Sequence, residues 1–257
     1  MSQWVQDTKP EQAIKALEKH FLAFDEIKKH PSHIYKTLFD NISIHSLSDS
    51  LVIVLPDIDK LPSAFPEFPE KTDSDWFSIQ TYLGIVSWIA FHLIVDTKSL
   101  VRGAITKGQY FQKEISSSNN QFVFSKALYK AHRLEQKAGT PRIIIEDSIQ
   151  QDILSKEKSL SSLAFRDDDG KYCLDIYTTS IPHQEREKHL DNMALSLNEQ
   201  WKRLEGIPRQ EYESVSTKLF WFTGYHNRSI DELLRRSEIK DKDRFKVKVP
   251  EFLIFNK

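Results

Sequence analysis

Two side chains in this sequence, Asp49 and Arg133, are our candidates for binding a divalent cation and a phosphate. Asp49 lies between two apolar segments, 41–45 and 50–55, and carboxylate oxygens are the ligands that hard cations such as Mg²⁺ prefer. Arg133 lies in a helical pattern at 125–138, and a guanidinium donates two parallel hydrogen bonds to a phosphate. Each residue also has an ordinary interpretation, as a turn aspartate in Ser-Asp-Ser and as a solvated helix arginine. Residue type alone leaves the choice open.

The composition excludes several other kinds of site. The 257 residues include 36 Lys or Arg and 37 Asp or Glu, so the net charge of −1 gives no overall field that attracts nucleic acid. Cys173 is the single cysteine, which excludes a disulfide within the chain and argues against a Cys-based zinc site. No P-loop, GxSxG, kinase or GGDEF pattern occurs, residues 167–170 lack EF-hand spacing, and His183 and His189 match no common zinc motif.

Hydropathy gives no membrane segment. The most apolar stretch, residues 83–95, is shorter than the roughly 20 residues that a bilayer span needs, and it contains Ser87 and His92. The N-terminal residues have no apolar run after a basic start, so they do not resemble a secretory signal. We expect a cytoplasmic protein without membrane or nucleic-acid partners.

The order of apolar and polar residues predicts a mixed fold of helices and strands. Residues 9–29 have helical spacing, and the two apolar segments around Asp49 predict a hairpin. Downstream the sequence predicts, in order, a proline-rich loop at 56–71, a buried helix at 75–95, a strand at 99–106, a surface loop at 109–120, a helix at 125–138, a strand at 142–146, a helix at 147–155, and a hairpin of 160–166 and 171–177. This alternation is typical of α/β or α+β layered proteins.

The last quarter of the chain has a helical character. Residues 183–204 predict an amphipathic helix whose apolar face holds Leu190, Met193, Leu197, Trp201 and Leu204. A second helix at 209–225 contains most of the aromatic run LFWFTGYHN, which either packs internally or forms a partner surface. We therefore expect a domain at 1–180 and a helical appendage at 181–257.

Four segments in a fixed order carry a resemblance to a known family. They are SLSDSLVIV (46–54), VRGAITKG (101–108), FSKALYKAHRLE (124–135) and PRIII (141–145). Together they make residues 1–180 resemble the catalytic domain of class III nucleotide cyclases, most closely the bacterial Pycsar pyrimidine cyclases of anti-phage defence. The resemblance implies a ferredoxin-like α+β sandwich and a head-to-tail homodimer with sites between protomers. It also implies a reaction in which the 3′-hydroxyl of a nucleoside triphosphate attacks its own α-phosphate and pyrophosphate leaves.

The resemblance assigns roles to three of these residues. Asp49 matches the second metal-binding aspartate of the family, which holds two Mg²⁺ or Mn²⁺ ions that lower the pKa of the hydroxyl and neutralise the phosphates. Arg133, from the other protomer, matches the arginine that meets charge developing on the α-phosphate. Tyr129, one turn before Arg133, stands where the family usually has Asn. This departure is compatible with the pyrimidine branch.

Two further residues match the positions that set base choice in the family. They are His45 and Phe122, where adenylate cyclases typically have Lys and either Asp or Thr. His45 either binds a base edge or ends a strand, and Phe122 is either a platform for the base or a core residue. Ser125 replaces the glycine that opens the following helix in the family. Because the adenine determinants are absent, UTP or CTP is the expected substrate.

The first metal-binding aspartate of the family has no counterpart here. It lies on an opening strand of pattern F-x-D-x-x-G, well before the second aspartate. Asp25 imitates the pattern but falls inside a predicted helix too close to Asp49, and Asp7 is a weak substitute. We expect that Met1 is an internal start and that residues 1–257 alone have weak or no turnover. The alternative function is a catalytically impaired cyclase-fold protein that senses a nucleotide or binds a partner.

Overall fold

The structure is a computed structural model that describes residues 18, 42–47, 50–55, 74–98, 100–115, 120–156, 163–177, 186–205, 207–236 and 239–250. Asp49, the predicted helix at 9–29 and the predicted loop at 56–71 therefore lie outside the described residues, apart from residue 18, which is helical. The chain divides into two compact units, Met1–Val86 and Ser87–Lys257, and each is described separately below. The predicted boundary at residue 180 remains a prediction.

In the first unit, the described strands form the hairpin that the sequence predicts. Strands β1 (Ser43–Leu47) and β2 (Ser50–Val54) pair antiparallel, with Leu47 opposite Ser50 and His45 opposite Val52. β1 extends two residues beyond its predicted end. Helix α5 (Ser74–Thr97) begins in this unit and ends in the second, close to the predicted bounds of 75–95.

The second unit contains a four-stranded mixed sheet with the order β3-β6-β8-β7. β3 (Gly103–Ile105) runs parallel to β6 (Ile143–Ile145), while β8 (Tyr172–Leu174) is antiparallel to both β6 and β7 (Ala164–Arg166). All three isoleucines of β6 are buried, as expected for a central strand of the sheet. The strand predicted at 99–106 has three residues in the structure. The predicted hairpin of 160–166 and 171–177 is confirmed by the antiparallel pairing of β7 and β8.

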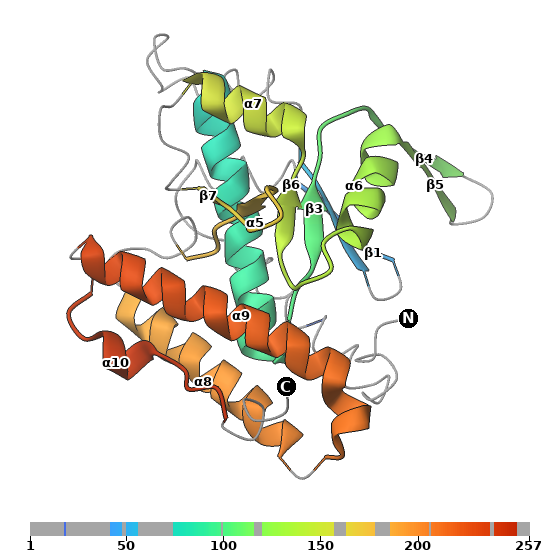
Figure 1. Cartoon of the computed structure of the whole chain (residues 1–257). Helices are drawn as coiled ribbons and strands as arrows, with labels where there is room; N and C mark the ends of the chain where they lie inside the picture. The colour runs from blue at the N-terminus through green and yellow to red at the C-terminus, as the bar shows by residue number, and fades with distance from the viewer. Residues whose placement is uncertain are drawn as a thin grey trace. The chain divides into compact units, whose positions relative to one another are not determined.

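Two helices accompany this sheet, and both were predicted. α6 (Lys126–Gln136) lies between β3 and β6 in the chain, and α7 (Asp147–Lys156) follows β6 directly (Figure 1). The Ser125 hydroxyl caps α6 by accepting a hydrogen bond from the Leu128 N–H at 3.0 Å. A Cβ added at Gly108 would lie 3.3 Å from the Ala127 Cβ. Glycine at this position therefore lets the backbone after β3 pass close to the start of α6.

The predicted surface loop at 109–120 is wrong. Residues on both sides of the polar run form an antiparallel hairpin, β4 (Tyr110–Ile115) and β5 (Asn120–Ser125), in which Phe111 faces Phe124. The β-forming aromatic and branched residues on the two flanks decide this segment, because they pair across the hairpin. The SSSNN run made the whole segment look like a loop.

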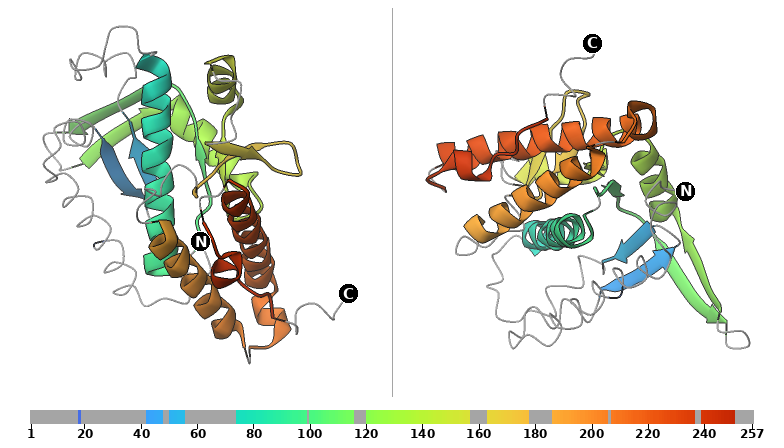
Figure 2. Two further views of the ribbon diagram at one scale, coloured as in Figure 1. Left: turned by 90° about the vertical axis from the view of Figure 1, so that its left-hand side faces the viewer. Right: turned by 90° about the horizontal axis from the view of Figure 1, so that it is seen from below.

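The C-terminal part is helical, as predicted. α8 (Arg186–Leu204) buries the whole predicted apolar face, and α9 (Arg209–Arg235) lies beside it (Figures 1 and 2). A hydrogen bond of 3.1 Å from the Trp201 indole N–H to the Thr223 hydroxyl joins them. α9 runs ten residues beyond its predicted end at residue 225. The short α10 (Lys242–Phe245), capped by Asp241, was not predicted.

The aromatic run of α9 serves internal packing for the most part. Its buried members are Leu219, Phe222, Thr223, Tyr225 and His226, while Phe220 is exposed. The described residues form a mixed α/β fold, with a four-stranded mixed sheet, accompanying helices and packed C-terminal helices. The described strands form three separate sheets, and none of these unites the β1–β2 hairpin with β3.

Among the described helices, none combines the length and apolar character that crossing a bilayer requires.

Candidate functional site

Arg133 and Tyr129 form an exposed pair on α6. The guanidinium carbon of Arg133 lies 5.9 Å from the centroid of the Tyr129 ring, within the range of a cation–π contact. Tyr129 is 64% exposed, and Arg133 is also exposed. Within the described residues, no carboxylate pairs with Arg133. Its hydrogen-bond donors therefore face solvent and are available to an anionic ligand.

Glu146 fixes α6 at the carboxyl ends of the two parallel strands. One of its carboxylate oxygens accepts a hydrogen bond from the Lys130 ammonium at 2.7 Å, and the other accepts one from the backbone N–H of Lys107 at 2.9 Å. The Glu146 N–H also donates to the Ile105 carbonyl at 2.9 Å. Burial raises the pKa of Glu146, but these two donors outweigh it and lower the pKa below its ordinary value. A charged Glu146 thus holds Lys130 inward on the helix that carries Arg133.

Several cations of α6 and of the strand ends have acidic partners. Lys107 pairs with Asp152 at 3.0 Å, and Arg102 pairs with Glu135 on α6 itself. His132 lies 3.9 Å from the same Glu135 carboxylate. These contacts attach α6 and α7 to the ends of the strands. Arg133 differs from them because its neighbour is a ring rather than an acid.

The arginine of the PRIII segment has a structural role that the sequence did not predict. Arg142 is buried, and its guanidinium donates to both Asp167 and Asp169, the latter through two bonds of 2.6 and 3.0 Å. Its Nε also donates to the Ala138 carbonyl at 3.0 Å. Hydrogen bonds from Arg142 and Lys171 hold the pKa of Asp169 well below its ordinary value. The acidic run at 167–169 lies 25 residues from Arg142 in the sequence, so no local spacing signalled this clamp.

Of the five predicted site residues, Tyr129 and Arg133 are in contact within the described part of the second unit. His45 is partly buried on β1 in the first unit. Phe122 lies on β5 with Lys113 as its backbone partner, and its side chain is outside the described part. Asp49 also falls outside it. Lys130 and Glu146, which position α6, were not singled out from the sequence because an isolated Lys and Glu carry no recognisable spacing.

Metal ligands are not gathered in the described part of the chain. Within those residues, no group of three or more His, Cys, Asp or Glu side chains is placed to hold an ion. Cys173 is buried, and its burial raises the pKa of the thiol to about 12, so it is neither a thiolate ligand nor a nucleophile at neutral pH. The described residues by themselves therefore do not fit the two ions that the sequence predicts, and the candidate ligand remains Asp49.

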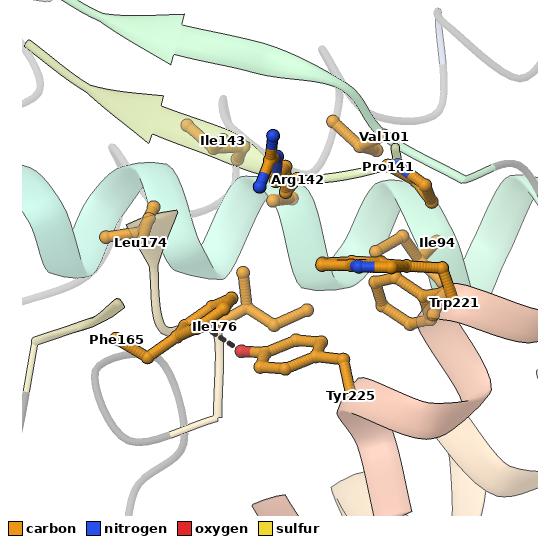
Figure 3. A pocket seen from close by; sticks show the side chains of 12 residues that line it. Ile94, Val101, Pro141, Arg142, Ile143, Phe165, Leu174, Ile176, Trp221 and Tyr225 are labelled. Atoms are coloured by element: carbon orange, nitrogen blue, oxygen red, sulfur yellow. Dashed lines mark hydrogen bonds between the residues drawn. The ribbon is translucent and has the colours of Figure 1, made fainter. Parts of the chain in front are cut away.

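A small cavity lies within the second unit between α5, the sheet and α9 (Figure 3). Its volume of about 10 Å³ is that of roughly one water molecule. Apolar side chains dominate its lining, with Arg142 and Trp221 among the residues around it. The Tyr225 hydroxyl beside it accepts the Ile176 N–H at 3.0 Å and donates to Asp175 at 2.8 Å. This cavity is a packing gap, too small for a nucleotide.

The best candidate site in the described residues is therefore the open face of α6 rather than an enclosed pocket. An arginine and a tyrosine on one helix face suit an anionic ligand that approaches from outside the unit. Comparison with known proteins adds no identity to this geometry: no protein-family model, curated protein or solved structure matches the chain.

Proposed function

We propose that this protein is a metal-dependent nucleotide cyclase that converts UTP or CTP to the 3′,5′-cyclic nucleotide and pyrophosphate. Its role would be that of the signal-producing enzyme of an anti-phage defence system. The observation that carries the proposal is the exposed Arg133, held beside Tyr129 on a helix that connects two parallel strands and without an acidic partner among the described residues. The proposal includes a ferredoxin-like class III cyclase domain as the finer description of the mixed α/β fold.

The chemistry requires an arginine with free donors. The 3′-oxygen of the nucleotide forms a bond to the α-phosphorus, the bond from that phosphorus to the pyrophosphate oxygen breaks, and the hydroxyl proton passes to solvent. Negative charge grows on the non-bridging α-phosphate oxygens, and a guanidinium stabilises it with two hydrogen bonds. An arginine engaged like Arg142, with four of its five N–H donors bonded inside the protein and its side chain buried, cannot perform this task. Arg133 retains its donors.

The remaining parts of the proposed site come from other segments. Asp49 of one protomer holds Mg²⁺ or Mn²⁺, and Tyr129 and Arg133 come from the other protomer of a homodimer. The ions, when bound, neutralise the phosphates and lower the pKa of the attacking hydroxyl. His45 and Phe122 are the proposed base-selecting residues. In this proposal, Glu146 and Lys130 are positioning residues for Arg133, because their hydrogen bond fixes the helix that carries it.

A product assay tests the proposal directly. Purified residues 1–257 are incubated with Mn²⁺ and each radiolabelled NTP in turn, and 3′,5′-cyclic products are separated by chromatography. We expect cyclic UMP or cyclic CMP at a low rate, with a loss of about 100-fold or more in Arg133→Ala, the scale for removing a donor to a transition-state oxyanion. Arg203→Ala is the matched control, because Arg203 is also an exposed helix arginine but lies on α8, outside the proposed site.

Two results would contradict the proposal. One is the absence of both nucleotide binding and cyclic product for all four NTPs, and the other is equal activity in the wild-type chain and Arg133→Ala. Tight nucleotide binding without turnover, measured by isothermal titration calorimetry, would instead favour the nucleotide-sensing alternative.

A further inference from the structure

Aromatic side chains of the second unit form a continuous series of ring contacts that runs into its core. Trp221 on α9 is partly buried, and its ring stacks on that of Tyr225 with centroids 5.8 Å apart (Figure 3). The buried Tyr225 ring lies 5.3 Å from the ring of Tyr177, and Tyr177 lies 5.5 Å from the ring of His226. We call these four side chains the aromatic path.

Both tyrosines of the aromatic path are hydrogen-bonded to a base. The Tyr225 hydroxyl donates to the Asp175 carboxylate at 2.8 Å. The Tyr177 hydroxyl lies 2.8 Å from Nδ1 of His226, whose Nε2–H donates to the Phe245 carbonyl. Burial lowers the pKa of His226 to about 4, so the ring is neutral and Nδ1 accepts. Burial also raises the pKa of both tyrosines, so each phenol keeps its proton in the resting protein.

This arrangement meets the chemical requirements for oxidation of a buried phenol. A phenol in the interior loses an electron readily only when its proton leaves as well, because burial disfavours the radical cation. A base within hydrogen-bond distance receives that proton without rearrangement. A backbone carbonyl would satisfy a buried hydroxyl but takes up no proton, whereas a carboxylate and a neutral imidazole do. The two phenols thus have more than the contacts that core packing requires.

We propose that Tyr177 and His226 form a redox-active tyrosine site, which Trp221 and Tyr225 connect with small one-electron oxidants of the radical class. The oxidant takes one electron from the Trp221 indole and is itself reduced. Tyr225 returns an electron to Trp221, and its phenolic proton passes to the Asp175 carboxylate. Tyr177 then reduces the Tyr225 radical, which recovers its proton from Asp175, while the Tyr177 proton moves to Nδ1 of His226. The end state is a neutral tyrosyl radical beside an imidazolium.

Pulse radiolysis of the full chain in azide solution tests the proposal. Azidyl radicals oxidise tryptophan in preference to tyrosine at neutral pH, and tryptophanyl and tyrosyl radicals have distinct absorption bands. In the wild-type chain we expect the tryptophanyl signal to decay into a tyrosyl signal at a rate independent of protein concentration. The rate should fall in D₂O, because a proton moves with the electron. Neither readout involves a nucleotide, so the test is independent of the proposed function.

Two tryptophan variants test the point of entry. Trp221→Phe should remove most of the tyrosyl growth, because the first ring of the aromatic path no longer accepts the oxidising equivalent. Trp88→Phe is the matched control, since Trp88 is also a partly buried helix tryptophan but has its described ring contact with His92, at 4.4 Å. We expect the control to retain the wild-type growth.

Two further variants test where the radical comes to rest. Tyr177→Phe keeps the ring but removes the phenol, so the radical should stop at Tyr225 and have a shorter lifetime. His226→Gln should shorten the lifetime as well, because an amide accepts a hydrogen bond but no proton. Circular dichroism of each variant shows whether the fold is retained, and Tyr177→Phe is the smaller change of the two.

Three outcomes would each overturn the proposal. The first is a wild-type chain without concentration-independent growth of the tyrosyl signal. The second is an equal loss of that growth in Trp221→Phe and Trp88→Phe. The third is a radical lifetime in folded Tyr177→Phe that equals the wild-type value.

Discussion

Arg142 and Arg133 come from neighbouring segments and have opposite surroundings. The Arg142 side chain is 7% exposed, and its donors go to Asp167, Asp169 and the Ala138 carbonyl. Arg133 is exposed and contacts the ring of Tyr129. The fold thus engages the Arg142 guanidinium in internal hydrogen bonds and leaves the Arg133 guanidinium available to a ligand. Residue type and a position in a motif do not distinguish these cases, whereas the partners of the guanidinium do.

The interior of the second unit repeats the pattern of Arg142. The His226 ring is fully buried, with Nδ1 2.8 Å from the Tyr177 hydroxyl and Nε2 2.8 Å from the Phe245 carbonyl. Because a carbonyl only accepts, Nε2 carries the proton, and Nδ1 of the neutral ring accepts from Tyr177. These interior groups bind each other and tie α9 to α10. On α6, by contrast, Arg133 keeps its donors toward solvent.

Arg142→Met should have the largest effect on stability. Removing one partner of a buried ion pair leaves Asp167, also 7% exposed, without its counter-charge, and such a loss costs about 3–5 kcal/mol. Urea denaturation followed by circular dichroism measures it. Arg102→Met, which breaks a more exposed pair with Glu135, should cost less than about 1 kcal/mol. Equal losses in the two variants would remove the contrast between clamped and surface arginines.

Acid should weaken the buried histidine network next. Burial lowers the pKa of His226 from 6.5 to about 4, so between these values the unfolded chain binds a proton that the folded chain does not. Its contribution is complete above pH 6.5 and is lost as the pH falls to 4, a change of about 3 kcal/mol. The unfolding free energy measured across this range should slope less in His226→Gln. The same slope in both proteins would contradict the neutral, buried ring.

Gly170→Ala should give a smaller loss of about 1 kcal/mol. Gly170 has a φ of +82° in the turn that presents Asp167 and Asp169 to Arg142, and an L-residue is strained there. Thermal unfolding of the variant is the measurement. A gain in stability would show that the turn relaxes without disturbing the clamp.

Arg133→Ala should have the smallest effect on stability, within about 0.5 kcal/mol, because its side chain is exposed and has no ion pair to lose among the described residues. The same urea titration used for Arg142→Met gives the value. A loss of several kcal/mol would make Arg133 a second structural arginine and would end the comparison.

The sequence predicts elements well where local signals agree. Ser125 as a cap and apolar spacing give α6, and the run of three isoleucines gives β6. The β4–β5 hairpin was missed because cross-strand pairing of Phe111 with Phe124 outweighs the polar run between them. The sequence prediction ended α9 at residue 225, whereas the buried Ile230 and Leu233 continue its packed face to Arg235.

For the candidate site, spacing placed Tyr129 and Arg133 on one helix face, and the structure confirms that placement. It gave no indication that Glu146 would hold Lys130, since that bond joins a strand end to a helix through the fold. The clamp on Arg142 is likewise a long-range product of sheet pairing, in which β7 and β8 bring the acidic turn to the start of β6. The roles of His45, Phe122 and Asp49 remain predictions.

The central claim is that two copies of this chain complete one site, with Asp49 from one copy and Arg133 from the other. Mixing purified Asp49→Ala with Arg133→Ala tests it most directly, with cyclic nucleotide as the readout. Each variant alone should be inactive. After subunit exchange, about half of the dimers are mixed and each has one intact site, so the mixture should recover about a quarter of the wild-type activity. Activity of either variant alone, or no recovery on mixing while the wild-type chain is active, would contradict the claim.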